Sequence, residues 1–142
     1  MPARGDPPDF LVDTSVSVAI SVMDHEHHGA TLAALAGARL GLAGHAAFET
    51  FSVLTRLPAP ARRSPATVAR LLAQSFPHSR FLGARAASSL LAELERAGLG
   101  GGAVYDALVA ACANEHGLPL ATRDRRALGT YRALGVRVEF VG

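Results

Sequence analysis

The sequence predicts an α/β fold built on a parallel β-sheet with helices on both faces. Short apolar runs typical of buried strands alternate along the chain with longer stretches that have helical periodicity. Proline and glycine residues punctuate the boundaries between them. Strands separated by helices pair in parallel, and right-handed crossovers bring all their carboxyl ends to one edge of the sheet.

The expected strands cover 9–13, 39–44, 79–82, 118–122 and 136–141. The expected helices cover 15–23, 25–37, 45–57, 64–76, 84–98, 103–117 and a short segment from 124 to about 134.

In the first half, the apolar run 10–12 stops at Asp13, where a helix begins. The helix expected over 25–37 and the strand expected over 39–44 follow. The stretch 45–57 has an apolar period of 3.6 residues and is stopped by prolines at 58 and 60. Ser64 then caps the next helix, with Pro65 at its first position.

In the second half, a short strand near 79–82 precedes a long helix that ends at Gly98. The glycines at 100–102 form a flexible turn before the helix at 103–117. The strand "LPLAT", a short helical segment and the final strand "VRVEFV" complete the chain.

The length of 142 residues predicts one domain over 1–142, with a flexible N-terminus over 1–8. Cys112 is the only cysteine, so no intrachain disulfide can form, and its apolar surroundings indicate a small core residue. The N-terminus lacks the apolar region of a secretory signal. The stretch 30–48 is too weakly hydrophobic, and interrupted by Arg39 and His45, to span a membrane. We therefore expect a cytoplasmic protein with no membrane partner.

Four acids fall at or near predicted strand ends and helix starts. Asp13 ends the first strand, and Asp124 follows the fourth strand almost immediately. Asp106 lies in the first turn of one helix, and Glu49 lies near the start of another. All four are expected at the same edge of the sheet.

Each acid alone has an ordinary structural explanation. Asp13 and Asp124 suit helix caps, Asp106 suits the helix dipole, and Glu49 fits a solvated stripe with Ser52 and Arg56. Together the four favour function, because clustered carboxylates raise one another's pKa values unless a cation lies among them. Oxygen ligands without cysteine favour Mg²⁺, with Mn²⁺ as an alternative.

The charge balance favours a polyanionic partner. The net charge is +2 and every basic residue is arginine, so no P-loop lysine exists. Without the four clustered acids, eight acids remain against fourteen arginines. A GC-rich genome explains an arginine-only composition equally well. The arginines expected to hold the phosphates of such a partner are Arg56, Arg123, Arg125 and Arg126.

The histidine-rich stretch "DHEHHGA" resembles a metal tract, but no cysteine or distal ligand accompanies it, so we expect a surface helix there. His45 has i, i+4 spacing to Glu49 and is assigned a supporting or solvent-facing role.

Four segments, "DFLVDTSV", "FETFSVLTRL", "VYDALVAACANEHGLPLATRDRRAL" and "GVRVEFV", resemble PIN domains, specifically the VapC-type toxins of bacterial toxin–antitoxin pairs. The resemblance extends from about Phe10 to Val141. It implies a three-layer α/β/α sandwich with a five-stranded parallel sheet and a metal-dependent ribonuclease site. The matching site residues are Asp13, Glu49, Asp106 and Asp124 as catalytic metal ligands, with Ser15 and Thr14 as support for the metal site.

The resemblance further implies a homodimer that cleaves single-stranded regions of structured RNA, either tRNA or rRNA, and is neutralised by a cognate VapB-type antitoxin. Two alternatives stay open: a catalytically silent PIN-like module that binds RNA or protein, and a DNA-directed nuclease. The intact set of four acids favours an enzyme over the silent module. The short chain disfavours the DNA nuclease, which carries extra segments.

Overall fold

Strands and helices alternate as the sequence predicts. The computed structural model describes residues 7–142. The elements are β1 (Phe10–Val12), α1 (Thr14–Ser21), α2 (His28–Ala34), β2 (Leu40–Leu42), α3 (His45–Thr55), α4 (Pro65–Ser75), α5 (Ala84–Ala97), α6 (Ala103–His116), β3 (Leu120–Thr122), the 3₁₀ turn η1 (Arg125–Ala127), α7 (Leu128–Ala133) and β4 (Val138–Phe140).

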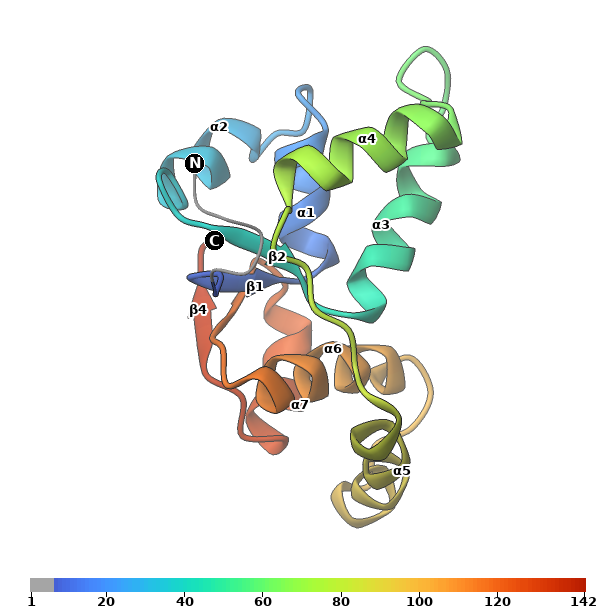
Figure 1. Ribbon diagram of the computed structural model, residues 1–142, viewed down its shortest axis with the longest axis vertical. Helices are drawn as coiled ribbons and strands as arrows, with labels where there is room; N and C mark the ends of the chain where they lie inside the picture. Colours follow the sequence, from blue (N-terminus) through green and yellow to red (C-terminus); the bar gives the residue numbers. More distant parts are fainter. Residues whose placement is uncertain (1–6) are drawn as a thin grey trace.

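The strands form one parallel sheet in the order β2-β1-β3-β4. In Figure 1, α1 to α4 lie on one side of the sheet and α6 and α7 on the other, with α5 packed beyond α6. The α/β architecture with helices on both faces is therefore confirmed. Because the strands are parallel, their carboxyl ends share one edge, where functional side chains gather in such sheets.

The core lies on both faces of the sheet because strand side chains alternate. In β1, Leu11 packs in the cluster beneath α6 and α7, whereas its neighbour Val12 packs in the cluster with α1 and β2. In β3, Leu120 lies in the same cluster as Leu11, and Ala121 lies in the same cluster as Val12. Cys112 is buried in the same cluster as Leu11, as the sequence predicts. Burial raises the pKa of its thiol to about 12.

The expectation of five strands is wrong, since the described residues form four. The segment expected as a strand at 79–82 makes only an isolated parallel bridge, between Arg80 and Ala43. Ser79 explains the interruption, because its Oγ accepts the N–H of Leu42 at 2.8 Å in place of a backbone carbonyl. The ladder beside β2 therefore does not extend into a full strand.

The helix expected over 25–37 is shorter, His28–Ala34. The residues before it form a turn in which Nδ1 of His25 accepts the N–H of His27 at 3.1 Å. This bond competes with a helical start. The flexible segment expected over 1–8 falls mostly on residues 1–6, which lie outside the described residues. No helix within 7–142 is both long enough and apolar enough to cross a membrane.

Candidate active site

The four acids singled out in the sequence line one small cavity at the carboxyl edge of the sheet. Its volume is about 80 Å³, and its walls are formed by Asp13, Thr14, Ser15, Glu49, Asp106, Val109, Asp124 and Tyr131. The structure therefore brings together side chains from α1, α3, α6 and the segment after β3. Both predicted supporting residues, Ser15 and Thr14, are also in the wall.

Asp13 both caps a helix and lines the cavity. It follows β1 directly, and its Oδ1 accepts the N–H of Val16, at 3.2 Å, which caps α1. Asp124 does the same after β3, where its Oδ1 accepts the N–H of Arg126 at 2.9 Å. The structural and functional interpretations of these acids are therefore compatible, because capping fixes each carboxylate at the edge of the sheet.

Asp13 is the most enclosed of the acids, with 4% of its surface exposed. Besides Val16, three hydroxyl groups donate to its carboxylate: Ser15 Oγ to Oδ1 at 2.5 Å, and Thr122 Oγ1 and Tyr131 Oη to Oδ2 at 2.5 and 2.8 Å. Burial raises the pKa of Asp13, and these hydrogen bonds oppose that rise. The carboxylate is held rigidly at the base of the cavity.

Thr122 and Tyr131 were not identified from the sequence. Thr122 ends β3; its Oγ1 donates to Asp13 and accepts the N–H of Asp124 at 3.0 Å, so one hydroxyl connects two of the acids. The hydroxyl at the end of a strand, two residues before an acid, was an available signal. Tyr131 gave none, because α7 brings it under the cavity only in the folded chain. Burial, together with the charge of Asp13, raises the pKa of Tyr131, so its phenol stays protonated as a donor.

The pKa of Asp106 reflects the charges of the other three acids. Its pKa is raised to about 6, first by partial burial and then by repulsion from Asp124, Glu49 and Asp13, with Arg126 opposing. The four carboxylates thus share one field, which a cation between them would relieve. Glu49 contacts His45, with its Oε1 3.4 Å from Nε2 of the imidazole.

The donor set fits a hard divalent cation, since carboxylate and hydroxyl oxygens surround the cavity. Within residues 7–142, however, no three His, Cys, Asp or Glu side chains stand at the spacing of a closed metal site. Both oxygens of Asp13 already accept hydrogen bonds from hydroxyl groups.

The predicted phosphate-binding arginines divide into two groups. None of the four lines the acidic cavity itself. Arg126 lies next to the cavity, with Nε 3.5 Å from Asp124 and a side chain 94% exposed. Arg123 lines an adjoining groove of about 560 Å³, together with Arg126, although its guanidinium also donates to Thr31.

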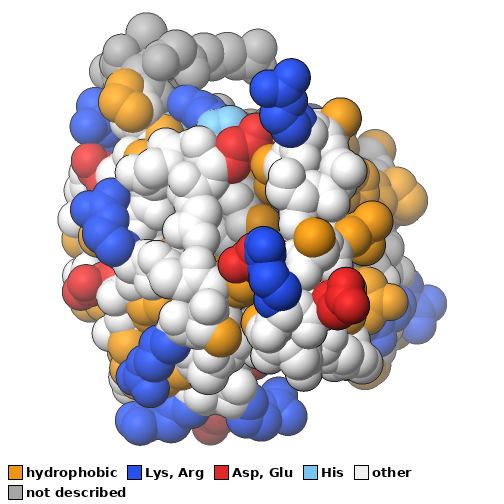
Figure 2. Space-filling view, turned by 90° about the horizontal axis from the view of Figure 1, so that it is seen from below, with side chains coloured by type: hydrophobic (Ala, Val, Ile, Leu, Met, Phe, Trp, Pro, Cys, Tyr) orange, Lys and Arg blue, Asp and Glu red, His pale blue; other side chains and the backbone are white. Residues whose placement is uncertain are grey.

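Neither Arg125 nor Arg56 lines the adjoining groove. Arg125 lies over the ring of Phe140, and Arg56 bonds Ser52 within its own region. On the face seen in Figure 2, arginines are scattered among acidic side chains rather than gathered in one patch.

The histidine-rich stretch contributes to the same groove. His25 and His27 line it beside Glu49 and Asp124, whereas the ring of His28 bonds the carbonyl oxygen of Ala19 at 2.8 Å. The stretch therefore forms a groove wall next to the acids.

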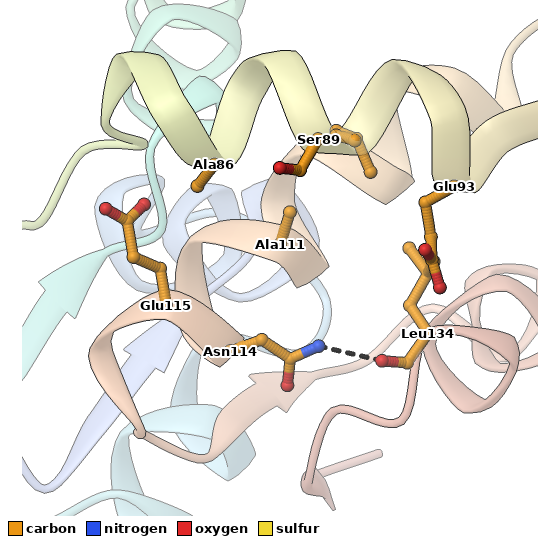
Figure 3. A pocket seen from close by; sticks show the side chains of 8 residues that line it. Ala86, Ser89, Glu93, Ala111, Asn114, Glu115 and Leu134 are labelled. Atoms are coloured by element: carbon orange, nitrogen blue, oxygen red, sulfur yellow. Dashed lines mark hydrogen bonds between the residues drawn. The ribbon is translucent and has the colours of Figure 1, made fainter.

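A larger hollow, of about 360 Å³, lies between α5 and α6 (Figure 3). Small side chains on the facing helices, Ala86, Ser89 and Ala111, leave this space. Two of its polar groups are engaged with the protein: Asn114 donates to the carbonyl of Leu134 at 2.8 Å, and Glu115 accepts the N–H of Gly83 at 2.9 Å. The chemistry that the sequence predicts lies instead in the small acidic cavity.

The PIN-domain family model matches residues 10–133, a span that contains all four acids. This chain belongs to the PIN-domain family. Among its relatives are two proteins of Mycobacterium tuberculosis. Ribonuclease VapC27 is 47% identical over 131 residues, covering 92% of this PIN domain and 96% of the relative. Ribonuclease VapC40 is 46% identical over 131 residues, covering 91% and 96%.

A solved structure confirms the PIN fold. The DNA-bound VapBC from Salmonella typhimurium matches this PIN domain with a TM-score of 0.65 at 22% identity, over 94% of this chain and 98% of the other. At that identity the likeness shows the fold. The relatives place the chain among the VapC-type PIN domains, as the sequence segments indicated.

Proposed function

We propose that this PIN domain is a metal-dependent endoribonuclease that acts as the toxin of a toxin–antitoxin pair in the cytoplasm. The observation that carries the proposal is the single cavity lined by Asp13, Glu49, Asp106 and Asp124. Relatives 46–47% identical over most of their length, both named ribonucleases, support the reaction class. The substrate we propose is a single-stranded region of a structured RNA, tRNA or rRNA.

The surroundings of the four acids suit them to different roles in holding a cation. Asp13, fixed by four donors, is the rigid ligand, whereas Asp106, Glu49 and Asp124 are more exposed and complete the site. A Mg²⁺ or Mn²⁺ ion bound there would supply positive charge for the scissile phosphate and lower the pKa of an attacking water. Ser15 and Thr122 orient Asp13 by donating to its two oxygens.

Arg126 supplies a side chain free to reach a phosphate next to the cavity. Attack by water in line with the leaving 3′-oxygen would give a 5′-phosphate and a 3′-hydroxyl end. The RNA 2′-hydroxyl takes no part.

The partners we infer are an antitoxin of the VapB type and a second copy of the chain. A VapBC complex is among the structures with the same fold. The exposed aromatic side chains of Phe48 and Phe81, which contact each other and are 65% and 54% exposed, favour a surface that a partner covers.

Induced expression tests the proposal. We expect growth arrest from the natural chain and none from Asp106→Asn or Asp124→Asn, with Asp24→Asn, an exposed acid outside the cavity, retaining the arrest. In vitro, cleavage of total RNA should stop in EDTA and return with Mg²⁺ or Mn²⁺, and sequencing of 5′-phosphate ends would identify the target. Full cleavage in EDTA, or by either cavity variant, would contradict the proposal.

A further inference from the structure

One exposed aromatic side chain, that of Tyr105, is connected to the acidic cavity through His45 and Glu49. Tyr105, immediately before Asp106, is 53% exposed. Its ring stacks on that of His45, with centroids 5.2 Å apart and planes 19° apart. His45 in turn lies 3.4 Å from Glu49. The stacked pair therefore has two links to the four acids. His45 contacts Glu49, and Tyr105 precedes Asp106 in the sequence.

We propose that Tyr105, backed by His45, is the stacking site for one unpaired nucleobase of the bound RNA. This inference rests on the proposed function and specifies how the substrate is held. RNA-binding proteins recognise single strands by stacking splayed bases on aromatic rings, so a half-exposed ring at a nuclease site has the chemistry required.

His45 prepares the ring for this role. Stacking on His45 restrains the ring of Tyr105, and 53% of the residue stays exposed, which leaves ring surface for a second stacking partner. A ring already held in place loses little conformational entropy when a base stacks on it, which favours binding. His45 is therefore a positioning residue for the ring.

The surrounding charges favour a nucleotide over an apolar protein surface. A protein laid over Tyr105 would remove the neighbouring carboxylates, Glu49 and Asp106, from water, which costs free energy unless each is paired. A nucleotide can instead place its base on the ring and its phosphate over the cation-binding acids. Arg126, at another part of the rim, offers the charge for the adjacent phosphate.

A second aromatic pair lies close by. Phe48 and Phe81, 65% and 54% exposed, have ring centroids 6.1 Å apart. With His45 and Leu108 they line a hollow of about 320 Å³. Apart from His45, the side chains that line this hollow are apolar. It is therefore the part of the surface that a second copy of the chain would cover, and the experiment must separate the two roles.

Binding is measured in an Asp124→Asn background, which we expect not to cleave RNA. The probe is a six-nucleotide single-stranded RNA with 2-aminopurine at one internal position, in low salt with Mg²⁺, and a matched oligomer that is abasic there. We expect the fluorescence to be quenched on binding. Tyr105→Ala should weaken binding about five- to 150-fold and abolish the quenching, whereas Tyr105→Phe should retain both. Binding of the abasic oligomer should not respond to either variant.

Leu91→Ala, a matched exposed side chain on α5, should leave binding unchanged. Unchanged binding by Tyr105→Ala, equal losses in Tyr105→Phe and Tyr105→Ala, or absence of binding by the Asp124→Asn protein would overturn the inference. A changed oligomeric state of Tyr105→Ala in sedimentation would overturn it in favour of a second copy. Because binding is read without cleavage, failure of the nuclease proposal shows separately, as RNA left intact by the natural chain.

Discussion

Replacing Asp106 by asparagine tests the electrostatic description of the cavity directly. The substitution keeps the shape of the side chain and removes one of four like charges. Asp106 is suited to this test because it is partly exposed, so the change should perturb packing little. We expect Asp106→Asn to be more stable than the natural protein when no divalent cation is present.

The magnitude follows from the pKa of Asp106, raised from 3.8 to about 6. That shift corresponds to about 3 kcal/mol for a fully buried group, and solvent screening of this partly exposed carboxyl reduces it to about 1 kcal/mol. Because the folded protein binds the proton more tightly, ionisation lowers the stability as pH rises from 3.8 to about 6. The whole cost is therefore present at pH 7.5 and absent below pH 3.8.

Thermal and urea unfolding in EDTA measure the effect. At pH 7.5 Asp106→Asn should melt about 3–5 °C higher than the natural protein, and at pH 4.5 less than half of that difference should remain. Asp24→Asn, an exposed acid away from the cavity, is the matched control and should change the melting temperature little at either pH. Addition of Mg²⁺ should raise the melting temperature of the natural protein and reduce or reverse the advantage of the variant.

The reasoning fails if Asp106→Asn is no more stable than the natural protein at pH 7.5 in EDTA. It also fails if the advantage is equally large at pH 4.5, since repulsion between ionised carboxylates should then be weaker.

Four further predictions concern the scaffold. Gly41→Ala should lower the free energy of unfolding by more than about 3 kcal/mol, because its Cβ would lie 2.1 Å from the carbonyl oxygen of His78. Gly29→Ala in α2, with nothing within 4 Å, should raise it by up to about 1 kcal/mol in the same urea titration. Tyr131→Phe should cost about 1–2 kcal/mol by removing a buried donor to Asp13, whereas Tyr105→Phe should cost nothing measurable. Cys112 should react with a thiol reagent at pH 8 only after unfolding, because burial raises its pKa to about 12.

The strand-to-acid junctions were predictable because they are local. An apolar run that ends in Asp13, and another that is followed by Asp124, indicate both the strand and its carboxyl edge. The rules for parallel sheets then bring the two acids together without knowledge of packing. The helical acids, Asp106 and Glu49, required the additional step of placing each helix start at that edge.

Features that depend on side-chain competition were not predictable. The segment at 79–82 has the composition of a strand, yet Ser79 takes the N–H of Leu42 that a further strand would have used. The role of Tyr131 depends on how α7 packs beneath β1, and periodicity contains no information about that. The stack of His45 on Tyr105 joins two residues sixty positions apart in the chain and is visible only in the folded protein.

The groups around Asp13 explain how a cavity without closed metal geometry can still accept a cation. A carboxylate offers about four lone-pair positions, and Asp13 receives four hydrogen bonds, so its capacity is filled. Only one of these donors, the N–H of Val16, is fixed by the backbone. The other three donors are hydroxyl groups. Rotation about the C–O bond can turn each hydroxyl hydrogen away from Asp13, which frees a lone pair of the carboxylate for a cation. Replacing Thr122 by valine would remove one rotatable donor and the acceptor for the N–H of Asp124. We therefore expect Thr122→Val to change both the cation affinity of the cavity and the stability of the protein.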